Sequence, residues 1–369
     1  MKIAYLIIVL LHGLIHLLGF VKGFELKEVK ELTLPISKPL GVVWLTATTL
    51  FLTYGVLQLL NFKYVWLLGL VAVVLSQVLI ILFWKDARFG TVPNIIILTV
   101  SIISFGYYDF QNMIQQETPQ LLNKNVSVEN RILNENDLVN LPDPVKKWLR
   151  NCGALGKPFI SYGKVTQIAE MQMKPEQDNW LTATAIQYTT IDNPAFIWAV
   201  DVKMNSLLNF QGRDKYDKGK GEMLIKLNSL FNVVNERGEK LDEGTLQRYL
   251  GEMVWFPLLA LNSYIYWEQI DENTAKATMT YKGTSGSGTF YFNSNGDVTK
   301  FSALRYKGNE IDAKRHDWEM NILDYKTFEG IKVPAKMTST WKLDDKDWTW
   351  LKMEITDIKY NKNAIPGLG

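Results

Sequence analysis

The 369-residue chain contains a single cysteine, Cys152, and only three histidines. One cysteine excludes an intramolecular disulfide framework, so cysteine usage does not indicate an oxidising or a reducing compartment. Cys152 lies far from any signal-like segment, and we expect it to be a small packed residue rather than a site of lipid attachment. Two histidines without a third ligand do not make a metal site, so we predict no metal and no cofactor.

Motifs that bind nucleotides or nucleic acids are also missing. The sequence has no G-x-x-x-x-G-K-[ST] loop and no G-x-G-x-x-G loop. The stretch Gly283–Gly288 lacks the final glycine of G-x-S-x-G, so we expect a flexible hairpin loop instead of a nucleophile elbow. The 40 basic residues are balanced by 38 acidic residues and are not interleaved with aromatic ones, which argues against a nucleic-acid partner.

No residue pattern identifies a catalytic centre. Acidic residues gather at turn-like positions, where solvated carboxylates are common, and no spacing singles out an acid–base pair. His316 lies in a segment with strand-like alternation, where a packed or surface role is expected. We therefore assign no catalytic residue. The acidic residues considered are Asp214, Asp217, Asp242, Glu243, Asp344 and Asp345.

Charge is absent from four long apolar runs in the first third of the chain. Each run has about the 20 residues that a helix needs to cross a hydrocarbon core about 30 Å thick. Backbone polar groups must be paired in lipid, so helices are the expected structure. The first run is too long for a typical signal-peptide core and lacks a cleavage-like site, so we interpret it as a span. The runs are Ile3–Val21, Leu40–Phe62, Tyr64–Trp84 and Phe89–Tyr108.

The distribution of basic residues in the short connections predicts an orientation. The first and third connections carry six Lys and Arg residues, whereas the opposite side carries only Lys2, Lys63 and Lys124. We therefore place the first and third connections in the cytoplasm. This predicts a multi-pass protein of the cell membrane, with the N-terminus and the C-terminal domain extracytoplasmic.

Polar residues inside the apolar runs are few. His12 and His16 are four residues apart and share one helix face. From their depth we expect two polar layers, His16 with Asn94 and His12 with Gln77, with Asp86 and Arg88 at the mouth of the bundle. Such layers are typical of a functional site, namely a proton path, a quinone or haem contact, or a small-ligand site. The alternative is a set of hydrogen bonds that only fix helix packing.

The remaining chain divides by composition into a linker and a second domain. We predict a transmembrane domain over residues 1–110, a polar and partly helical linker over 111–140, and a β-rich domain over 141–369. A short helix is expected to begin with Asp143 as N-cap and Pro144 in its first turn, and to end at Gly153 or Gly156.

Period-two alternation dominates the third part of the chain. Phe196, Trp198, Val200 and Val202 alternate with polar residues, and Asn295-Gly296 is a strong hairpin signal. Hairpin signals recur without intervening helices, which indicates an antiparallel meander of about nine to eleven strands. So many strands should curl. The predicted fold is multidomain α+β, with a four-helix transmembrane bundle followed by an antiparallel curled sheet or open barrel with one or two helices.

One helix is predicted inside this sheet, over Leu241–Leu261 with Pro257 near its end. We expect it to plug or cover the concave side of the sheet. Arg248 and Glu252 lie one turn apart, on the face opposite its apolar residues. As an exposed pair they would contribute only a few tenths of a kcal/mol; a buried, functional pair is the alternative.

Eight tryptophans lie beyond the linker. They can form a large core, or they can line a cavity for an apolar ligand such as an acyl chain. On the second interpretation we select Trp198, Trp255 and Trp318, with Arg248 and Glu252, as candidate ligand-binding residues. The eight are Trp180, Trp198, Trp255, Trp267, Trp318, Trp341, Trp348 and Trp350.

Three strings together carry a resemblance: His12–His16, Trp84–Thr91 and Arg248–Pro257. With them the chain resembles an uncharacterised bacterial family of membrane proteins that joins N-terminal transmembrane helices to a C-terminal domain of unknown function. The resemblance covers nearly the whole chain and implies no established activity. In architecture, a curled antiparallel sheet with an inner helix is similar to the LolA-like half-barrels of lipoprotein carriers, which bind acyl chains.

These observations favour an integral membrane protein whose extracytoplasmic β domain binds a lipid-like or other apolar ligand, as a carrier, a sensor or an envelope-maintenance protein. Its partners would then be membrane lipids and the ligand itself. The first alternative is a membrane enzyme or a redox or proton-handling protein that uses His12 and His16. The second is a structural or partner-binding module. Nothing in the sequence indicates an oligomeric state.

Overall fold

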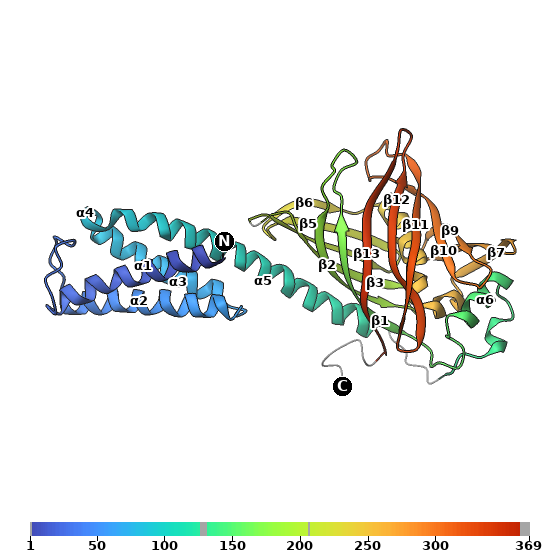
Figure 1. Ribbon diagram of the computed structural model, residues 1–369, viewed down its shortest axis with the longest axis horizontal. Coiled ribbons are helices and arrows are strands. Elements are labelled where there is room, and N and C mark those ends of the chain that lie inside the picture. Colours follow the sequence, from blue (N-terminus) through green and yellow to red (C-terminus); the bar gives the residue numbers. More distant parts are fainter. Residues whose placement is uncertain (1, 126–130, 206, 362–369) are drawn as a thin grey trace. The chain divides into compact units, whose positions relative to one another are not determined.

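The computed structural model describes residues 2–125, 131–205 and 207–361. The chain forms two compact units, one of residues 1–112 with 228–230, and one of residues 113–227 with 231–369. The first unit is helical and the second is built on one β-sheet (Figure 1).

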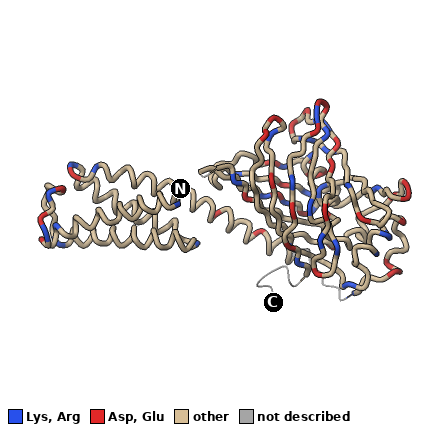
Figure 2. The backbone as a smooth tube through the Cα atoms, viewed as in Figure 1, with Lys and Arg blue, Asp and Glu red and all other residues tan. Residues whose placement is uncertain are grey.

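The helical unit contains four helices that are long and apolar enough to cross a membrane, as the sequence predicted. Figure 2 shows charged residues at the turns of this unit and almost none along its helices. Its elements are α1 (Lys2–Gly23), α2 (Lys38–Leu59), α3 (Val65–Leu82), α4 (Trp84–Ala87), η1 (Arg88–Gly90) and the first part of α5 (Thr91–Asn125).

Glycines allow these helices to approach closely. A Cβ on Gly19 of α1 would lie 2.2 Å from the ring of Trp44 of α2, and a Cβ on Gly69 of α3 would lie 2.2 Å from Ser101 Oγ of α5. Without a hydrophobic driving force between helices in lipid, such close packing is a main source of association.

The region expected to be a linker begins as helix. α5 continues without a break through Pro119 to Asn125. Its second half belongs to the β-sheet unit, where Leu121 and Leu122 are buried and Glu117 forms an ion pair with Arg213 at 3.3 Å. After residues 126–130 the chain forms the short η2 (Glu135–Leu138).

The short helix α6 (Asp143–Asn151) begins one residue earlier than expected, with Pro142 as its N-cap. It ends before Gly153, whose φ of +73° suits glycine. Val145, Trp148 and Leu149 of α6 are buried in the core, together with Cys152. Cys152 is therefore a packed residue, as the sequence predicted.

The β-sheet unit has thirteen strands among the described residues, more than the nine to eleven expected. All neighbours are antiparallel, in the order β6-β5-β4-β3-β2-β1-β13-β12-β11-β10-β9-β8-β7. The strands are β1 (Tyr162–Met171), β2 (Leu181–Thr190), β3 (Ala195–Lys203), β4 (Asn209–Asp217), β5 (Lys220–Leu227), β6 (Phe231–Glu236), β7 (Ile265–Asp271), β8 (Thr274–Tyr281), β9 (Thr284–Phe292), β10 (Val298–Tyr306), β11 (Arg315–Phe328), β12 (Ile331–Lys342) and β13 (Asp347–Tyr360).

The sheet curls into an open half-barrel (Figure 1). Register shifts in the β1–β13, β11–β12 and β12–β13 pairs mark irregularities of the β-bulge type, which increase local twist and bend a strand. The curled, open barrel-like α+β fold that the sequence predicted is therefore confirmed.

The expectation of a flexible loop at Gly283–Gly288 is wrong. The turn is confined to Lys282 and Gly283, which have positive φ, and strand β9 begins at Thr284. Gly286 and Gly288 face the interior. A Cβ on Gly288 would lie 2.1 Å from the ring of Phe301, so these glycines serve close packing.

The predicted long helix is divided into α7 (Glu239–Gly251), η3 (Glu252–Trp255) and η4 (Pro257–Leu261). Phe256 leaves helical geometry, with φ −130° and ψ 69°, because it precedes Pro257; the proline therefore begins η4 instead of ending a helix. α7 contacts strands β4, β5, β8, β9 and β10, and its apolar residues Leu246 and Leu250 are buried.

Candidate functional site

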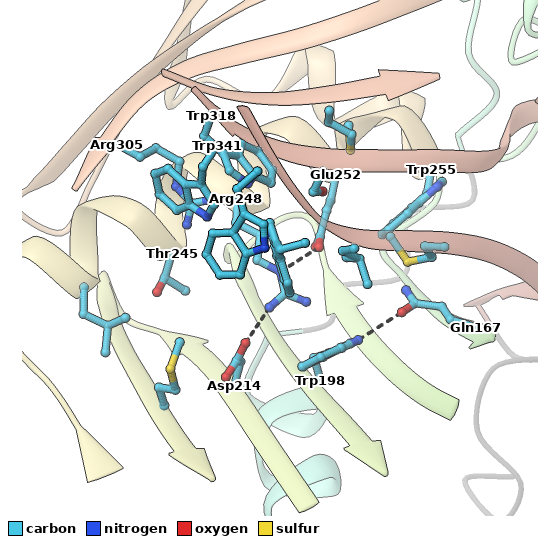
Figure 3. Close-up of a pocket in the computed structure, with 18 of the residues that line it drawn as sticks. Gln167, Trp198, Asp214, Thr245, Arg248, Glu252, Trp255, Arg305, Trp318 and Trp341 are labelled. Carbon is cyan, nitrogen blue, oxygen red and sulfur yellow. Dashed lines mark hydrogen bonds and ion pairs between the residues drawn. The ribbon is translucent and has the colours of Figure 1, made fainter. Parts of the chain in front are cut away.

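A cavity of about 270 Å³ lies between α7, η3 and the sheet (Figure 3). Its wall is formed by residues of β1, β3, β4, β5, β10, β11, β12 and β13 together with the helical segment. Tryptophan dominates this wall. The six tryptophans are Trp198, Trp255, Trp318, Trp341, Trp348 and Trp350.

The strand register explains why these rings meet. Trp318 of β11 is the direct partner of Trp341 of β12, and Trp341 is the direct partner of Trp348 of β13. Directly opposed residues of antiparallel strands lie on the same face. Three aromatic side chains, far apart in the sequence, therefore form one row on the inner face of the sheet.

Arg248 of α7 reaches two carboxylates and one amide. Its Nη1 is 2.6 Å from Asp214 Oδ2, its Nε is 2.8 Å from Glu252 Oε1, and its Nη2 donates to Gln187 Oε1 at 3.2 Å. Figure 3 shows the two ion pairs beside Trp198. The guanidinium carbon also lies 4.7 Å from the centre of the Trp198 ring, so the charge is held on an aromatic face.

This geometry corrects the exposed helix pair considered from the sequence. The side chains of Arg248 and Glu252 are only 19% and 8% exposed. The face of α7 that carries Arg248 is covered as well, because β4 supplies Asp214 and β2 supplies Gln187 to its guanidinium. Asp214 and Asp242 were expected to be solvated at turns. Asp214 instead bonds Arg248, and Asp242 accepts a hydrogen bond from Gly221 N at 2.7 Å.

Burial governs the electrostatics of this group. It raises the pKa of the Asp214 carboxyl above its ordinary value, although Arg248 acts in the opposite direction. Burial alone would lower the pKa of Arg248, but the charges of Glu252 and Asp214 offset this and raise it. Arg248 therefore stays charged, and the three groups form one ionic unit.

Two buried glutamines complete the inner polar contacts, and the sequence analysis missed both. Gln187 donates to Glu252 Oε2 at 2.6 Å, and Gln167 accepts from Trp198 Nε1 at 3.0 Å. A signal was available. Gln187 follows Ala183 and Ala185 at every second position of β2, so all three face inward. A polar residue at a position that the pattern places in the interior indicates a buried hydrogen bond.

Arg305 of β10 is the second arginine of the cavity and was also missed. Its guanidinium carbon lies 4.4 Å from the centre of the Trp318 ring and 5.6 Å from that of Trp341. Burial, and then the nearby charge of Arg248, lower the pKa of Arg305 to about 10. The register again offered a signal, because Arg305 follows the inward residues Phe301 and Ala303.

The structure brings together all five residues selected from the tryptophan pattern. Trp198, Trp255, Trp318, Arg248 and Glu252 line the same cavity. They come from β3, α7, η3 and β11.

The polar residues selected from the sequence in the helical unit, His12, His16, Gln77 and Asn94, form one cluster instead of two layers. His12 Nε2 is 2.8 Å from Asn94 Oδ1, and His16 Nε2 is 2.8 Å from Ser76 Oγ. Asn94 Nδ2 donates both to Ser76 Oγ and to Gln77 Oε1 at 3.0 Å. Ser76, which the sequence analysis did not select, links the two histidines. Because these groups satisfy one another, the cluster is typical of helix packing.

Asp86 does not join this cluster. Its carboxylate accepts hydrogen bonds from the backbone N–H groups of Thr33 and Leu34 and from the Thr33 hydroxyl. It therefore fixes the connection between α1 and α2. Within residues 2–125, 131–205 and 207–361, no group of three or more His, Cys, Asp or Glu residues has a geometry that could hold a metal ion.

Comparisons with known proteins give a family and two distant structures. The model of a family described as "Family of unknown function (DUF6544)" matches residues 131–353. The comparison with curated proteins finds no match.

A LolA superfamily protein from Nitrosomonas europaea is 10% identical, with a TM-score of 0.34, over 60% of this chain and 94% of that chain. A β-barrel-like protein of domain of unknown function DUF1849 from Brucella abortus is also 10% identical, with a TM-score of 0.23, over 55% of this chain and 99% of that chain. A LolA superfamily member is thus among the similar structures, as the sequence suggested. Both similarities are too distant to transfer a ligand or an activity.

Proposed function

Because the chain belongs to the DUF6544 family, whose function is unknown, we propose its function from the cavity itself. The half-barrel binds a lipid-like or other apolar ligand in the cavity beneath α7, and the apolar helices anchor this domain to a membrane. A carrier, a sensor and an envelope-maintenance protein all require this binding step.

The observation that carries the proposal is the aromatic lining. Six tryptophans and three methionines surround a cavity of about 270 Å³. A core built only for stability closes such space, since interiors pack to crystal-like density. Ligand sites of small molecules span about 300–1,000 Å³. This cavity of about 270 Å³ lies just below that range, which suits one acyl chain or a small amphiphile.

The ionic unit of Arg248, Asp214 and Glu252 supports the cavity. It joins α7 and η3 to β4, and Gln187 extends it to β2. These bonds hold the helix above the sheet where apolar packing is interrupted by the cavity. In this proposal the unit is a positioning device, and the tryptophan faces contact the ligand.

The half-barrel is proposed to lie outside the cytoplasm, on the basis of the lysine-bearing connections. We expect a membrane-impermeant thiol reagent to label intact cells that carry Asp345→Cys, at the exposed turn between β12 and β13. The matched position is Glu28→Cys, in the connection after α1, which should react only after lysis. The native Cys152 is buried and does not interfere. The reverse labelling pattern would contradict the proposed orientation.

Filling the cavity should weaken ligand binding. Ser339 of β12 is 3% exposed and lines the cavity. Ser339→Trp is expected to reduce ligand capture by about tenfold or more, because overpacking a filled site costs about 1–3 kcal/mol. The measurement uses full-length protein and twelve-carbon chains that bear a photoreactive diazirine, with crosslinked peptides mapped by mass spectrometry.

The matched control is Thr338→Trp, at the neighbouring position on the other face of β12. It should retain crosslinking to the peptides of β3 and β11–β13. If no twelve-carbon probe, acidic or uncharged, marks these strands in the unaltered protein, the proposed function is wrong.

A further inference from the structure

The cavity wall contains four buried side-chain nitrogens that have no hydrogen-bond partner among the described residues. All four are N–H donors, and no oxygen of a lining residue shares this condition. Buried polar groups are nearly always paired, with protein, water or ligand. The four are Gln167 Nε2, Arg305 Nε, Trp318 Nε1 and Trp350 Nε1.

The chemistry of these side chains leaves no ambiguity about donor and acceptor. Indole and guanidinium nitrogens only donate. The amide of Gln167 is oriented by Trp198, whose indole N–H must find an acceptor and takes Gln167 Oε1 at 3.0 Å. The other end of that amide is therefore the NH₂ group. Among the described lining residues, the buried polar atoms without a partner are thus all donors and include no acceptor.

Arg305 also differs from Arg248 in its charge environment. Arg248 forms ion pairs with Asp214 and Glu252. Glu243, a further carboxylate whose charge acts on Arg305, forms its ion pair with Arg315 at 2.7 Å. Within the described part of the chain Arg305 has neither a hydrogen bond nor an ion pair, and its contacts are the faces of Trp318 and Trp341.

On the basis of the proposed function, we propose that the ligand is an amphiphile with an acidic head group, a carboxylate or a phosphate. Its oxygens accept hydrogen bonds from the Arg305 guanidinium, and its apolar chain lies along the tryptophans and methionines of the wall. Arg305 is then a specificity-determining residue. Charged hydrogen bonds of this type are the strong ones, and a guanidinium presents a fork that matches both head groups.

The same geometry argues against a cationic ligand. Aromatic cages hold quaternary ammonium groups by cation–π attraction. Here the faces of Trp318 and Trp341 are already occupied by the guanidinium of Arg305, and Trp198 holds that of Arg248. The ring faces that a cationic ligand would need are therefore already taken.

The test compares four diazirine probes with the same twelve-carbon chain, namely the carboxylic acid, the alkyl phosphate, the alcohol and the amine. Full-length protein is used, with crosslinks mapped to β10–β13. We expect the acid and the phosphate to label the unaltered protein at least about ten times as strongly as the alcohol, because one charged hydrogen bond is worth about that factor. The amine should label it least. Unlabelled dodecanoate should compete, whereas inorganic phosphate alone should not.

Arg305→Gln should bring acid labelling down to that of the alcohol, so that the ratio of acid to alcohol labelling falls to about one. Arg305→Lys keeps the charge and should retain part of the preference. Arg150→Gln is the matched control, since Arg150 and its ion-pair partner Glu135 are both exposed and neither lines the cavity. If a variant does not fold, the preference of the unaltered protein for the acid over the amine still tests the proposed acidic head group.

The outcomes separate the two proposals. Equal labelling by acid and alcohol, with Arg305→Gln without effect, keeps the apolar-ligand function and overturns the acidic head group. In that case Arg305 only balances the charges of Asp214 and Glu252, and its loss lowers stability instead of selectivity. Competition by inorganic phosphate as strong as by dodecanoate identifies a small-anion site and overturns the amphiphile. No labelling by any probe removes the proposed function itself.

Discussion

Arg248→Met is expected to lower the free energy of unfolding of the half-barrel by about 3–5 kcal/mol, since removing one partner of a buried ionic unit leaves uncompensated charge. Asp214 and Glu252 would remain inside the sheet with side-chain exposures of 16% and 8%. Methionine replaces most of the apolar volume of arginine, so the loss reports charge more than packing.

Denaturant titration of the full-length protein in detergent measures this effect. Arg237→Met is the matched control, because its surface ion pair should contribute at most about 1 kcal/mol. Asp214→Asn introduced together with Arg248→Met should restore part of the stability. If Arg248→Met and Arg237→Met unfold at the same denaturant concentration, the ionic unit does not hold α7 to the sheet.

The loss should also depend on pH. Burial already raises the pKa of Asp214 in the folded protein, and removing Arg248 raises it further. The pKa of an aspartate in the unfolded chain is about 4. A carboxyl with a higher pKa in the folded state lowers the free energy of unfolding at pH values above that folded pKa. This loss of stability disappears as the pH falls from the folded pKa to the unfolded pKa. Arg248→Met should therefore be less destabilising at about pH 5 than at about pH 8.

Gly288→Val is expected to destabilise the half-barrel by about 2–3 kcal/mol, because overpacking a closed core forces side chains and backbone to shift. The added Cβ would meet the ring of Phe301, which is completely buried, and the carbonyl oxygen of Ser302 at 3.1 Å. In a flexible loop, the same change would have little effect.

Ser285→Val is the control for this change. Ser285 lies on the same strand but is exposed, and a β-branched residue suits a strand, so its effect should stay within about 0.5 kcal/mol. Thermal unfolding of the two variants in parallel makes the comparison. Equal stability of Gly288→Val and the unaltered protein would mean that Phe301 does not pack against β9 as described.

The sequence by itself determined the kinds of structure in this protein. Four uncharged runs of about 20 residues predict helices in lipid, because an unpaired backbone has no alternative there. Alternation in segments such as Phe196–Val202 predicts inward and outward faces of a strand whatever its neighbours are. The tryptophan pattern even selected residues that meet at one cavity, since Trp198 and Trp318 each occupy an inward position.

Only the tertiary structure decided what each inward position touches. Arg248 and Glu252 look like an ordinary surface pair on a helix, and Asp214 looks like a turn residue, until the sheet closes around them. Gly286 and Gly288 suggest a loop when only local propensity is considered. In the folded chain, side chains of α7 and Phe301 occupy the space that a Cβ at these positions would need. Among the described residues Arg305 forms no ion pair because, in the folded chain, the neighbouring carboxylates form theirs with Arg248 and Arg315. Pairing across more than 30 residues depends on register and curvature, and those are properties of the whole sheet.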